Sequence, residues 1–229
     1  MYYPYFDPTM ILLIPALIIS FWAQSKVNST YNKYKKVRTI NGYSGNQVAR
    51  MILDEAGLFD VRIEQINSKL GDHYDPSSRV LRLSPEVYSG ATISSAGIAA
   101  HEVGHAIQHQ ELYKPLTLRN SIVPIVNFSS NMSWLIFFLG IFLGFKGMTT
   151  LGIILFLAVV VFQLITLPVE FDASTRALNI LKSRGLLYGD EVKGAEKVLN
   201  AAAMTYVAAT LMAISQLIRL IAISNSRDD

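Results

Sequence analysis

The sequence predicts a mainly α-helical membrane protein with about four transmembrane helices and a small α+β region. Of the 229 residues, 51% are hydrophobic and only 16% are charged. The mean hydropathy is +0.33, which is typical of a membrane protein rather than a soluble enzyme. Four apolar segments account for this excess, and two polar regions, residues 24–121 and 168–200, lie between them.

Each apolar segment is near or above the length that crosses a bilayer. The segments are residues 9–23, 122–145, 149–167 and 201–223. The first is the shortest and contains Pro15, so an interfacial or signal segment is the alternative. A cleaved signal needs a positive leader, but Asp7 is the only charged residue before this segment and basic residues follow it. We therefore interpret it as an anchor with its N-terminus outside.

Loop charge predicts the orientation of the remaining segments. Residues 24–121 contain 12 Lys or Arg and residues 168–200 contain 5, whereas the rest of the chain contains 3. The positive-inside rule then places both polar regions in the cytoplasm and both termini outside. The basic cluster after the first segment suits anionic membrane lipid better than nucleic acid, because no nucleic-acid motif accompanies it. A solvated loop with no lipid role is an equally good interpretation.

The first polar region is predicted to contain two helices and two strands before its longest helix. Ser44 to Gln47 form a capping-box pattern, which predicts a helix to about Glu55. Strands are expected at residues 61–66 and 79–83, with a loop at residues 71–78 between them. The sequence Ser-Pro-Glu at residues 84–86 predicts a second helix start.

Two more helices are predicted from residue patterns further along the chain. No proline interrupts residues 93–112, whose small and apolar residues favour a helix. A helix is also expected from residue 169 to about residue 184, ending at Gly185. Asp190 can then begin a last helix that continues into the fourth apolar segment.

His101, Glu102 and His105 form an HExxH motif inside the helix predicted at residues 93–112. Residues four apart lie about 40° around a helix and about 6 Å along it, so both imidazoles can face one metal ion. Glu102 lies about 100° around from His101 and can contact a water at the metal without being a ligand, as a general base must. The motif predicts a zinc hydrolase, and the alternative is a helix whose two histidines face water or cap a neighbour.

His109 follows His105 at the same spacing of four residues, but it cannot bind the same ion as His101. His101 and His109 are about 12 Å apart along a helix, too far for two bonds of about 2 Å. We interpret His109 as a neighbour of the site, a substrate contact or, more typically, a surface residue. The chain has no cysteine, which excludes thiolate ligands and leaves only histidine and carboxylate.

A catalytic zinc site has three protein ligands and one open position, so a third ligand is expected on the same side of the membrane. Glu170, at the cytoplasmic end of the third apolar segment, is the best candidate. Two crossings separate it from His105, which returns the chain to the same compartment. Alternatively, Glu170 is a carboxylate at a helix start, or it pairs with Arg176 or a nearby Lys. Asp172 could orient a ligand histidine, or it could bind the metal in place of Glu170.

Three further residues are weaker candidates for the site. Tyr88 and Arg176 could stabilise an oxyanion, although spacing alone does not place them against a metal. His73 could be a ligand, but a single histidine in a loop is more often solvated.

Five motifs together resemble one family, the YugP-type membrane zinc metallopeptidases, also called neutral zinc metallopeptidase family 2. The motifs are YFDP at residues 5–8, HYDP at 73–76, LRLSPEVY at 81–88, AAHEVGHAIQH at 99–109 and PVEFDAS at 168–174. The resemblance covers nearly the whole chain. It implies a prokaryotic multi-pass membrane protein with zinc-dependent endopeptidase activity, and its substrates would be peptides or membrane proteins.

A more distant likeness is to the HtpX/Ste24-type membrane gluzincins. In those proteins a Glu after later spans completes the site, and an Asp four residues on supports it. Glu170 matches that Glu, but position 174 is Ser and the acid is at position 172. Because Asp172 would point about 200° away from Glu170 on a helix, it cannot simply take the supporting role.

The predicted organisation has five parts. Residues 1–25 are an N-terminal transmembrane anchor, 26–116 a cytoplasmic zincin-like region, 117–168 a transmembrane hairpin, 169–200 a cytoplasmic helical region, and 201–229 a transmembrane helix and tail. By analogy, zincins bind the substrate backbone as an added strand beside the active-site helix. Residues 80–83 are the segment we expect to form that edge.

The predicted activity is hydrolysis of a peptide bond by zinc-activated water. One Zn²⁺ per chain would be held by His101, His105 and Glu170, with Glu102 as base and then proton donor. One alternative is a site-2-type intramembrane protease, but the stretch around Glu102, His109 and Glu111 is too polar and short to cross a bilayer. The other is a non-catalytic scaffold with a degenerate zinc site, which would have no need of Glu102.

Overall fold

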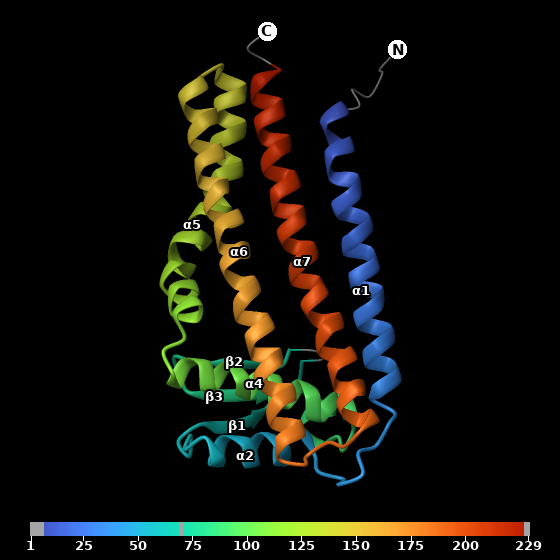
Figure 1. Ribbon diagram of the computed structural model, residues 1–229. Helices are drawn as coiled ribbons and strands as arrows, with labels where there is room; N and C mark the ends of the chain where they lie inside the picture. The colour runs from blue at the N-terminus through green and yellow to red at the C-terminus, as the bar shows by residue number, and fades with distance from the viewer. Residues whose placement is uncertain (1–6, 69–70, 227–229) are drawn as a thin grey trace. The chain divides into compact units, whose positions relative to one another are not determined.

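The computed structural model describes residues 7–68 and 71–226 (Figure 1). Tyr5 and Phe6 of the first motif and residues 227–229 of the tail lie outside the described residues. The chain is mostly helical and divides into two compact units. The helical unit comprises residues 1–23, 118–167 and 205–229, and the α+β unit comprises residues 24–117 and 168–204.

Four helices in the described part of the chain are long and apolar enough to cross a membrane, as the sequence predicts. They are η1 (Pro8–Leu13) continued by α1 (Ile14–Tyr34), α5 (Lys114–Leu143), α6 (Lys146–Ser183) and α7 (Asp190–Asn225). All four are longer than their apolar segments because each helix continues into polar sequence. A helix satisfies its own backbone hydrogen bonds both in lipid and beyond it, so nothing requires it to end where hydropathy falls.

The boundary predicted between the third span and the next helix was wrong. The sequence places a break at Pro168, whereas α6 runs unbroken from Lys146 to Ser183 with Pro168 inside it. Proline removes one helical hydrogen bond, and helices in membranes tolerate this loss because neighbouring groups satisfy the freed carbonyl. Glu170 therefore lies inside a continuous helix and not at a helix start.

Close packing of α5 against α6 builds the core of the helical unit. Phe137 of α5 is fully buried against Phe156 and Val160 of α6. A Cβ on Gly152 would lie only 2.7 Å from the Cβ of Phe137, so only glycine permits this approach.

An ion pair joins the N-terminal segment of the helical unit to its C-terminal helix. Asp7 caps η1 by accepting hydrogen bonds from the backbone N–H and hydroxyl of Thr9. Its other carboxylate oxygen accepts a hydrogen bond of 2.6 Å from the guanidinium of Arg219 on α7. The side chain of Arg219 is only 13% exposed, so its charge depends on this partner.

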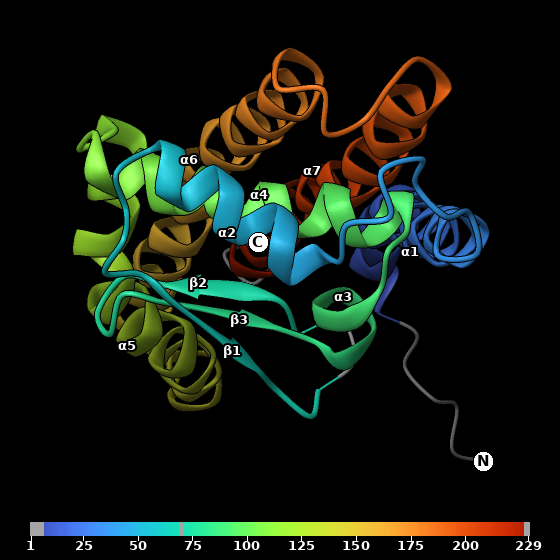
Figure 2. The ribbon, with the colours of Figure 1, turned by 90° about the horizontal axis from the view of Figure 1, so that it is seen from below.

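The α+β unit contains a three-stranded sheet in the order β1-β3-β2 among the described residues (Figure 2). Strand β1 (Arg62–Gln65) pairs in parallel with β3 (Val80–Leu83), and β2 (His73–Asp75) pairs antiparallel with β3. The helices α2 (Gly45–Glu55), α3 (Pro85–Ser89) and α4 (Ile93–Gln110) complete this part of the unit.

Several of these elements match the sequence prediction. Both hydrogen bonds of the predicted capping box are present between Ser44 and Gln47 at the start of α2. The proline predicted at a helix start is in the first turn of α3. Strands β1 and β3 lie within the predicted ranges, and α4 has the predicted start.

Two predictions about the sheet were wrong. Residues 73–75 were assigned to a loop but form β2, a strand too short to show an alternating pattern. Residues 80–83 were expected at an edge, yet β3 is paired on both sides, so its backbone cannot accept another strand. The edge strands are β1 and β2.

The core of the α+β unit surrounds α4. The buried residues of α4 pack with buried residues of α2, of the sheet, and of the parts of α6 and α7 within this unit. Examples are Leu53, Leu81, Leu181 and Leu199, all 2% exposed or less. This burial fixes α4 from several sides and makes it a rigid base for polar residues on its remaining face.

Candidate metal centre

Helix α4 presents both histidines of the HExxH motif from one face. His101 and His105 lie one turn apart, with ring centroids 4.7 Å apart and ring planes at 82°. The edge-on arrangement directs both Nε2 atoms towards one region of space. The helix begins at Thr92, whose hydroxyl accepts a hydrogen bond from the backbone N–H of Ser95.

Gly104 allows α6 to approach this face of α4 closely. A Cβ on Gly104 would lie 2.8 Å from the carbonyl oxygen of Ala173, closer than real Cβ atoms come to such an atom. Only glycine therefore permits the observed crossing of α4 and α6. The crossing places Glu170, one turn before Ala173 on α6, opposite the two histidines.

Three donor atoms converge at this crossing. The Oε2 atom of Glu170 is 3.4 Å from Nε2 of His101 and 3.6 Å from Nε2 of His105. All three donor atoms lie within 4.8 Å of one another, and Glu170 is only 3% exposed. Ligands bound to zinc at 2.0–2.2 Å with tetrahedral angles are about 3.4 Å apart, so two histidine nitrogens and one carboxylate oxygen at these separations fit zinc.

The other ring nitrogen of each histidine has a separate partner. Nδ1 of His101 is 3.2 Å from the hydroxyl of Ser174. Nδ1 of His105 is 3.0 Å from Oε1 of Gln108. These contacts orient the rings and leave both Nε2 atoms available as ligands, which is the usual arrangement of metal-binding histidines.

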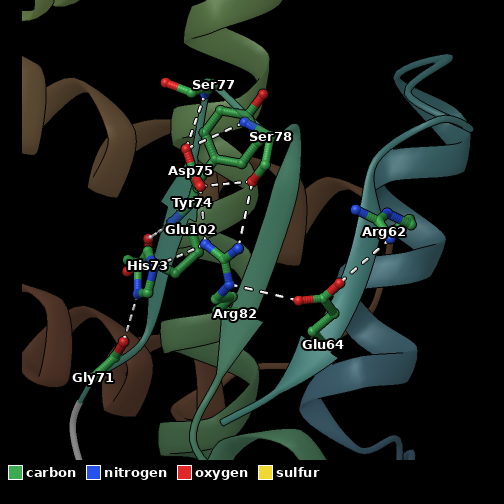
Figure 3. A network of polar contacts seen from close by, with 10 residues as sticks. All are labelled: Arg62, Glu64, Gly71, His73, Tyr74, Asp75, Ser77, Ser78, Arg82 and Glu102. Carbon is green, nitrogen blue, oxygen red and sulfur yellow. Dashed lines mark hydrogen bonds and ion pairs between the residues drawn. The ribbon is translucent and has the colours of Figure 1, made fainter.

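Glu102 lies beside the three donors but is not one of them. It is 9% exposed, and burial raises the pKa of its carboxyl above the ordinary value. Its Oε2 atom accepts a hydrogen bond of 3.1 Å from the backbone N–H of Tyr74 on β2, as Figure 3 shows. A buried carboxylate with a raised pKa is a stronger proton acceptor than a solvated one.

Polar contacts fix β2 beside Glu102 (Figure 3). Arg82 of β3 donates to Asp75 of β2 at 3.0 Å and lies 3.5 Å from Glu64 of β1, so one side chain spans all three strands. Asp75 also accepts hydrogen bonds from the hydroxyl of Ser78 and from two backbone N–H groups of the following turn. The network holds the edge strand at a fixed position relative to the sheet.

Comparison with known proteins identifies the family. A family described as "Putative neutral zinc metallopeptidase" matches residues 9–225. The chain belongs to this family. A protein of Bacillus subtilis (strain 168) named "Putative membrane protease YugP" is 52% identical over 219 residues, covering 95% of this chain and 97% of that protein. No solved structure matches the chain.

The family confirms the resemblance inferred from the five motifs. Its name implies zinc, and the donor set at the crossing of α4 and α6 suits that metal. The name of the relative and the four apolar helices together indicate a membrane protein.

Three of the remaining candidate residues lie close to the site of this family member. His109 is half-buried rather than on the open surface, and its Nδ1 is 3.0 Å from the hydroxyl of Tyr74. Asp172 is not in the donor group, and its Oδ2 accepts from Gln108 and from Arg176 instead. Arg176 pairs with Asp172 and Glu111.

The other two candidates lie among different partners. Tyr88 packs against the hydrophobic core of the α+β unit. His73 is exposed, and its ring contacts the carbonyl of Gly71 and the guanidinium of Arg82. Neither belongs to the group of donor atoms that could hold a metal among the described residues.

Sequence reasoning missed three residues at the site. Gln108 and His105 are three apart and so share a face of α4, a signal that could have identified Gln108. The serine at position 174 was noted in a family motif and as a departure from another family's pattern, but it was given no role. Tyr74 contributes its backbone N–H, so the type of its side chain could not have identified this contact.

Proposed function

We propose that this chain is a membrane-embedded zinc-dependent endopeptidase. The observation that carries this proposal is the convergence of His101, His105 and Glu170 within 4.8 Å of one another beside a buried Glu102. A structural metal site is usually closed by four protein ligands, whereas three ligands leave a position open for water and substrate. A purely structural site also has no use for an adjacent carboxylate that is not a ligand.

Each residue has a distinct role in this proposal. His101, His105 and Glu170 would hold the zinc, which as a Lewis acid would polarise the scissile carbonyl and lower the pKa of water. Glu102 takes the proton from the attacking water and then donates it to the leaving amine. The backbone N–H of Tyr74 keeps the Glu102 carboxylate directed towards the reaction.

The substrate backbone would lie along the edge of β2 that is not paired with β3. Tyr74 is paired with Leu81 of β3, and its N–H points to Glu102 on the other side of the strand. An extended peptide added at this edge would lie beside α4 and pass the donor atoms. The role first predicted for residues 80–83 is thus reassigned to residues 73–75.

The setting of the proposed enzyme is the cell membrane of a prokaryote. The distribution of Lys and Arg supports a cytoplasmic position for the α+β unit, with both termini outside. Cleavage would then occur near the inner membrane surface, on peptides or membrane proteins. The basic cluster after the first span would contact anionic lipid, and nucleic acid is not among the proposed partners.

The test is the zinc content of detergent-purified wild type beside Glu170→Ala and Glu102→Gln. We expect about one zinc per wild-type chain, a clear loss in Glu170→Ala, and full zinc in Glu102→Gln. Against a library of quenched fluorescent peptides, Glu102→Gln should lose activity by a factor of about 10² to 10⁴. Wild type without zinc, or Glu102→Gln with normal turnover, would refute the proposal.

A further inference from the structure

Gln108 is a fully buried polar residue, and the donor and acceptor of each of its side-chain hydrogen bonds can be assigned. It is 0% exposed and lies one turn after His105 on α4. Its Nε2 donates to the carbonyl of Val169 at 2.9 Å and to Oδ2 of Asp172 at 2.7 Å. Its Oε1 is 3.0 Å from Nδ1 of His105.

These partners determine the orientation of the amide. A backbone carbonyl can only accept, so the amide nitrogen must face Val169. The same Oδ2 atom of Asp172 is contacted at 2.6 Å by Nε of Arg176, which can only donate, so this oxygen acts as an acceptor towards both neighbours. The amide oxygen of Gln108 is therefore the atom that faces His105.

The orientation of Gln108 in turn determines the tautomer of His105. An amide oxygen can only accept, so Nδ1 of His105 must carry the proton. The Nε2 lone pair is then free on the side that faces Glu170 and His101. With the other tautomer, two lone pairs would meet at 3.0 Å in a buried site.

We propose that Gln108 is a positioning residue that transmits the orientation set by Asp172 and Arg176 to His105. This inference rests on the proposed zinc site, because the available Nε2 atom matters only when a metal binds there. It also gives Asp172 a role in supporting the site, which Asp172 cannot take directly from its own position on α6. Residues 170 and 172 point about 200° apart on a helix, and the Gln108 side chain spans that gap.

The two histidines are consequently held in different ways. The partner of His101 is the hydroxyl of Ser174, which can donate or accept and therefore imposes no tautomer. The partner of His105 belongs to a chain of contacts that continues through Asp172 and Arg176 to Glu111. Loss of Gln108 should weaken metal binding through His105 alone.

The experiment compares zinc affinity in Gln108→Met, Asp172→Ala and the double variant. Methionine keeps the length of the side chain and removes both hydrogen-bonding groups. Each zinc-loaded, detergent-purified protein is titrated with a chelator of known affinity. We expect Gln108→Met to bind zinc about 10- to 100-fold more weakly than wild type. Gln110→Met is the matched control, because Gln110 lies on the same helix but is exposed and bonded to Ala56.

Non-additivity is the result that separates transmission from a general loss of packing. Asp172 acts on His105 through Gln108, so the double variant should bind zinc no more weakly than Gln108→Met alone. The cobalt-substituted Gln108→Met protein should show a changed visible absorption spectrum while its far-UV circular dichroism matches wild type. Gln110→Met should leave both spectra unchanged.

Equal zinc affinity in Gln108→Met and Gln110→Met would overturn the inference, as would additive effects in the double variant. Asp172 has a side chain that is 29% exposed, so Asp172→Ala carries the test by itself if Gln108→Met does not fold. Unchanged zinc affinity in Asp172→Ala would then overturn it. These results would leave the zinc site standing, whereas wild type without zinc would refute the proposed function itself.

Discussion

Single residues decide whether the donors of the candidate metal centre can meet. Two come from α4 and the third from α6, so their separation depends on how closely the two backbones approach. Gly104 sets that distance, because a side chain at this position would collide with the carbonyl of Ala173. The glycine inside the HExxH motif therefore serves the packing of the helices and not the chemistry of the motif.

Gly104→Ala should destabilise the protein and weaken zinc binding together. The added Cβ would lie 2.8 Å from a backbone oxygen, and overpacking of this kind costs about 1–3 kcal/mol of folding free energy. Denaturant unfolding of the detergent-solubilised protein and zinc titration measure the two effects. Gly97→Ala is the control on the same helix, since its Cβ would lie 3.4 Å from the Cβ of Ala195, in ordinary contact. Equal effects at both positions would contradict the explanation.

The candidate site was predictable where its geometry is local. The spacing of His101 and His105 follows from one helical turn, and Glu170 was selected because two crossings return the chain to the same side. Its spacing could have identified Gln108 as a neighbour of His105, but not its contacts with Val169 and Asp172, because these residues lie on another helix. No property of residues 105–108 alone shows what lies opposite them.

At the scale of elements, β2 is the part of the fold that sequence patterns could least predict. It has three residues, is followed by a proline, and owes its position to contacts with Arg82 and the turn after it. By contrast, α2 and α3 carry their own start signals in Ser44 and Pro85, and both were predicted. Elements with local signals are predictable, and an edge strand held by side chains of its neighbours is not.

The stability contributed by Asp75 should depend on pH in a defined direction. Hydrogen bonds from Ser78 and then Arg82 hold the pKa of Asp75 below its ordinary value. The ionised form is thus favoured in the folded state, so its contribution is present above the unfolded pKa of about 4 and is lost as pH falls below it. Thermal unfolding of wild type and Asp75→Asn should differ most near neutral pH and converge in acid. A difference that stays constant down to about pH 3 would contradict this explanation.

Helix α6 shows why a local signal can also mislead. Pro168 marks a helix start in soluble proteins, and the sequence prediction placed a boundary there. Apolar residues precede this proline and helix-compatible residues follow it, so a single continuous helix satisfies more of the backbone than two helices would. The carboxylate of Glu170 is consequently held by a helix that is already formed on both sides.

At the scale of the whole molecule, the number of spans was predictable because hydropathy depends on composition alone. Contacts between distant parts of the sequence were not. The ion pair of Asp7 with Arg219 joins residues from opposite ends of the chain, and no pattern in the sequence links the two residues. Such a pair can be inferred only once the helices that carry it are placed.

Asp7→Ala should lower the thermal stability of the detergent-solubilised protein. The change leaves the largely buried guanidinium of Arg219 without its carboxylate. Adding Arg219→Leu to Asp7→Ala should restore part of the stability, because no charge then remains to be solvated. Unfolding temperatures of the two single variants and the double variant test this expectation. A double variant less stable than Asp7→Ala would show that Arg219 contributes through other contacts.

The placement of Glu170 after two apolar segments, α5 and the first part of α6, has a consequence for biosynthesis. The ribosome delivers α4 first, with two of the three donors, and the third emerges only after α5 and the apolar part of α6 have been made. Two imidazoles alone do not make a hydrolytic zinc site, which needs three protein ligands. If the proposed function holds, an incomplete chain would therefore be inactive whatever metal is available. For the proposed enzyme, the order of synthesis alone would protect neighbouring nascent proteins from cleavage until the hairpin is in place.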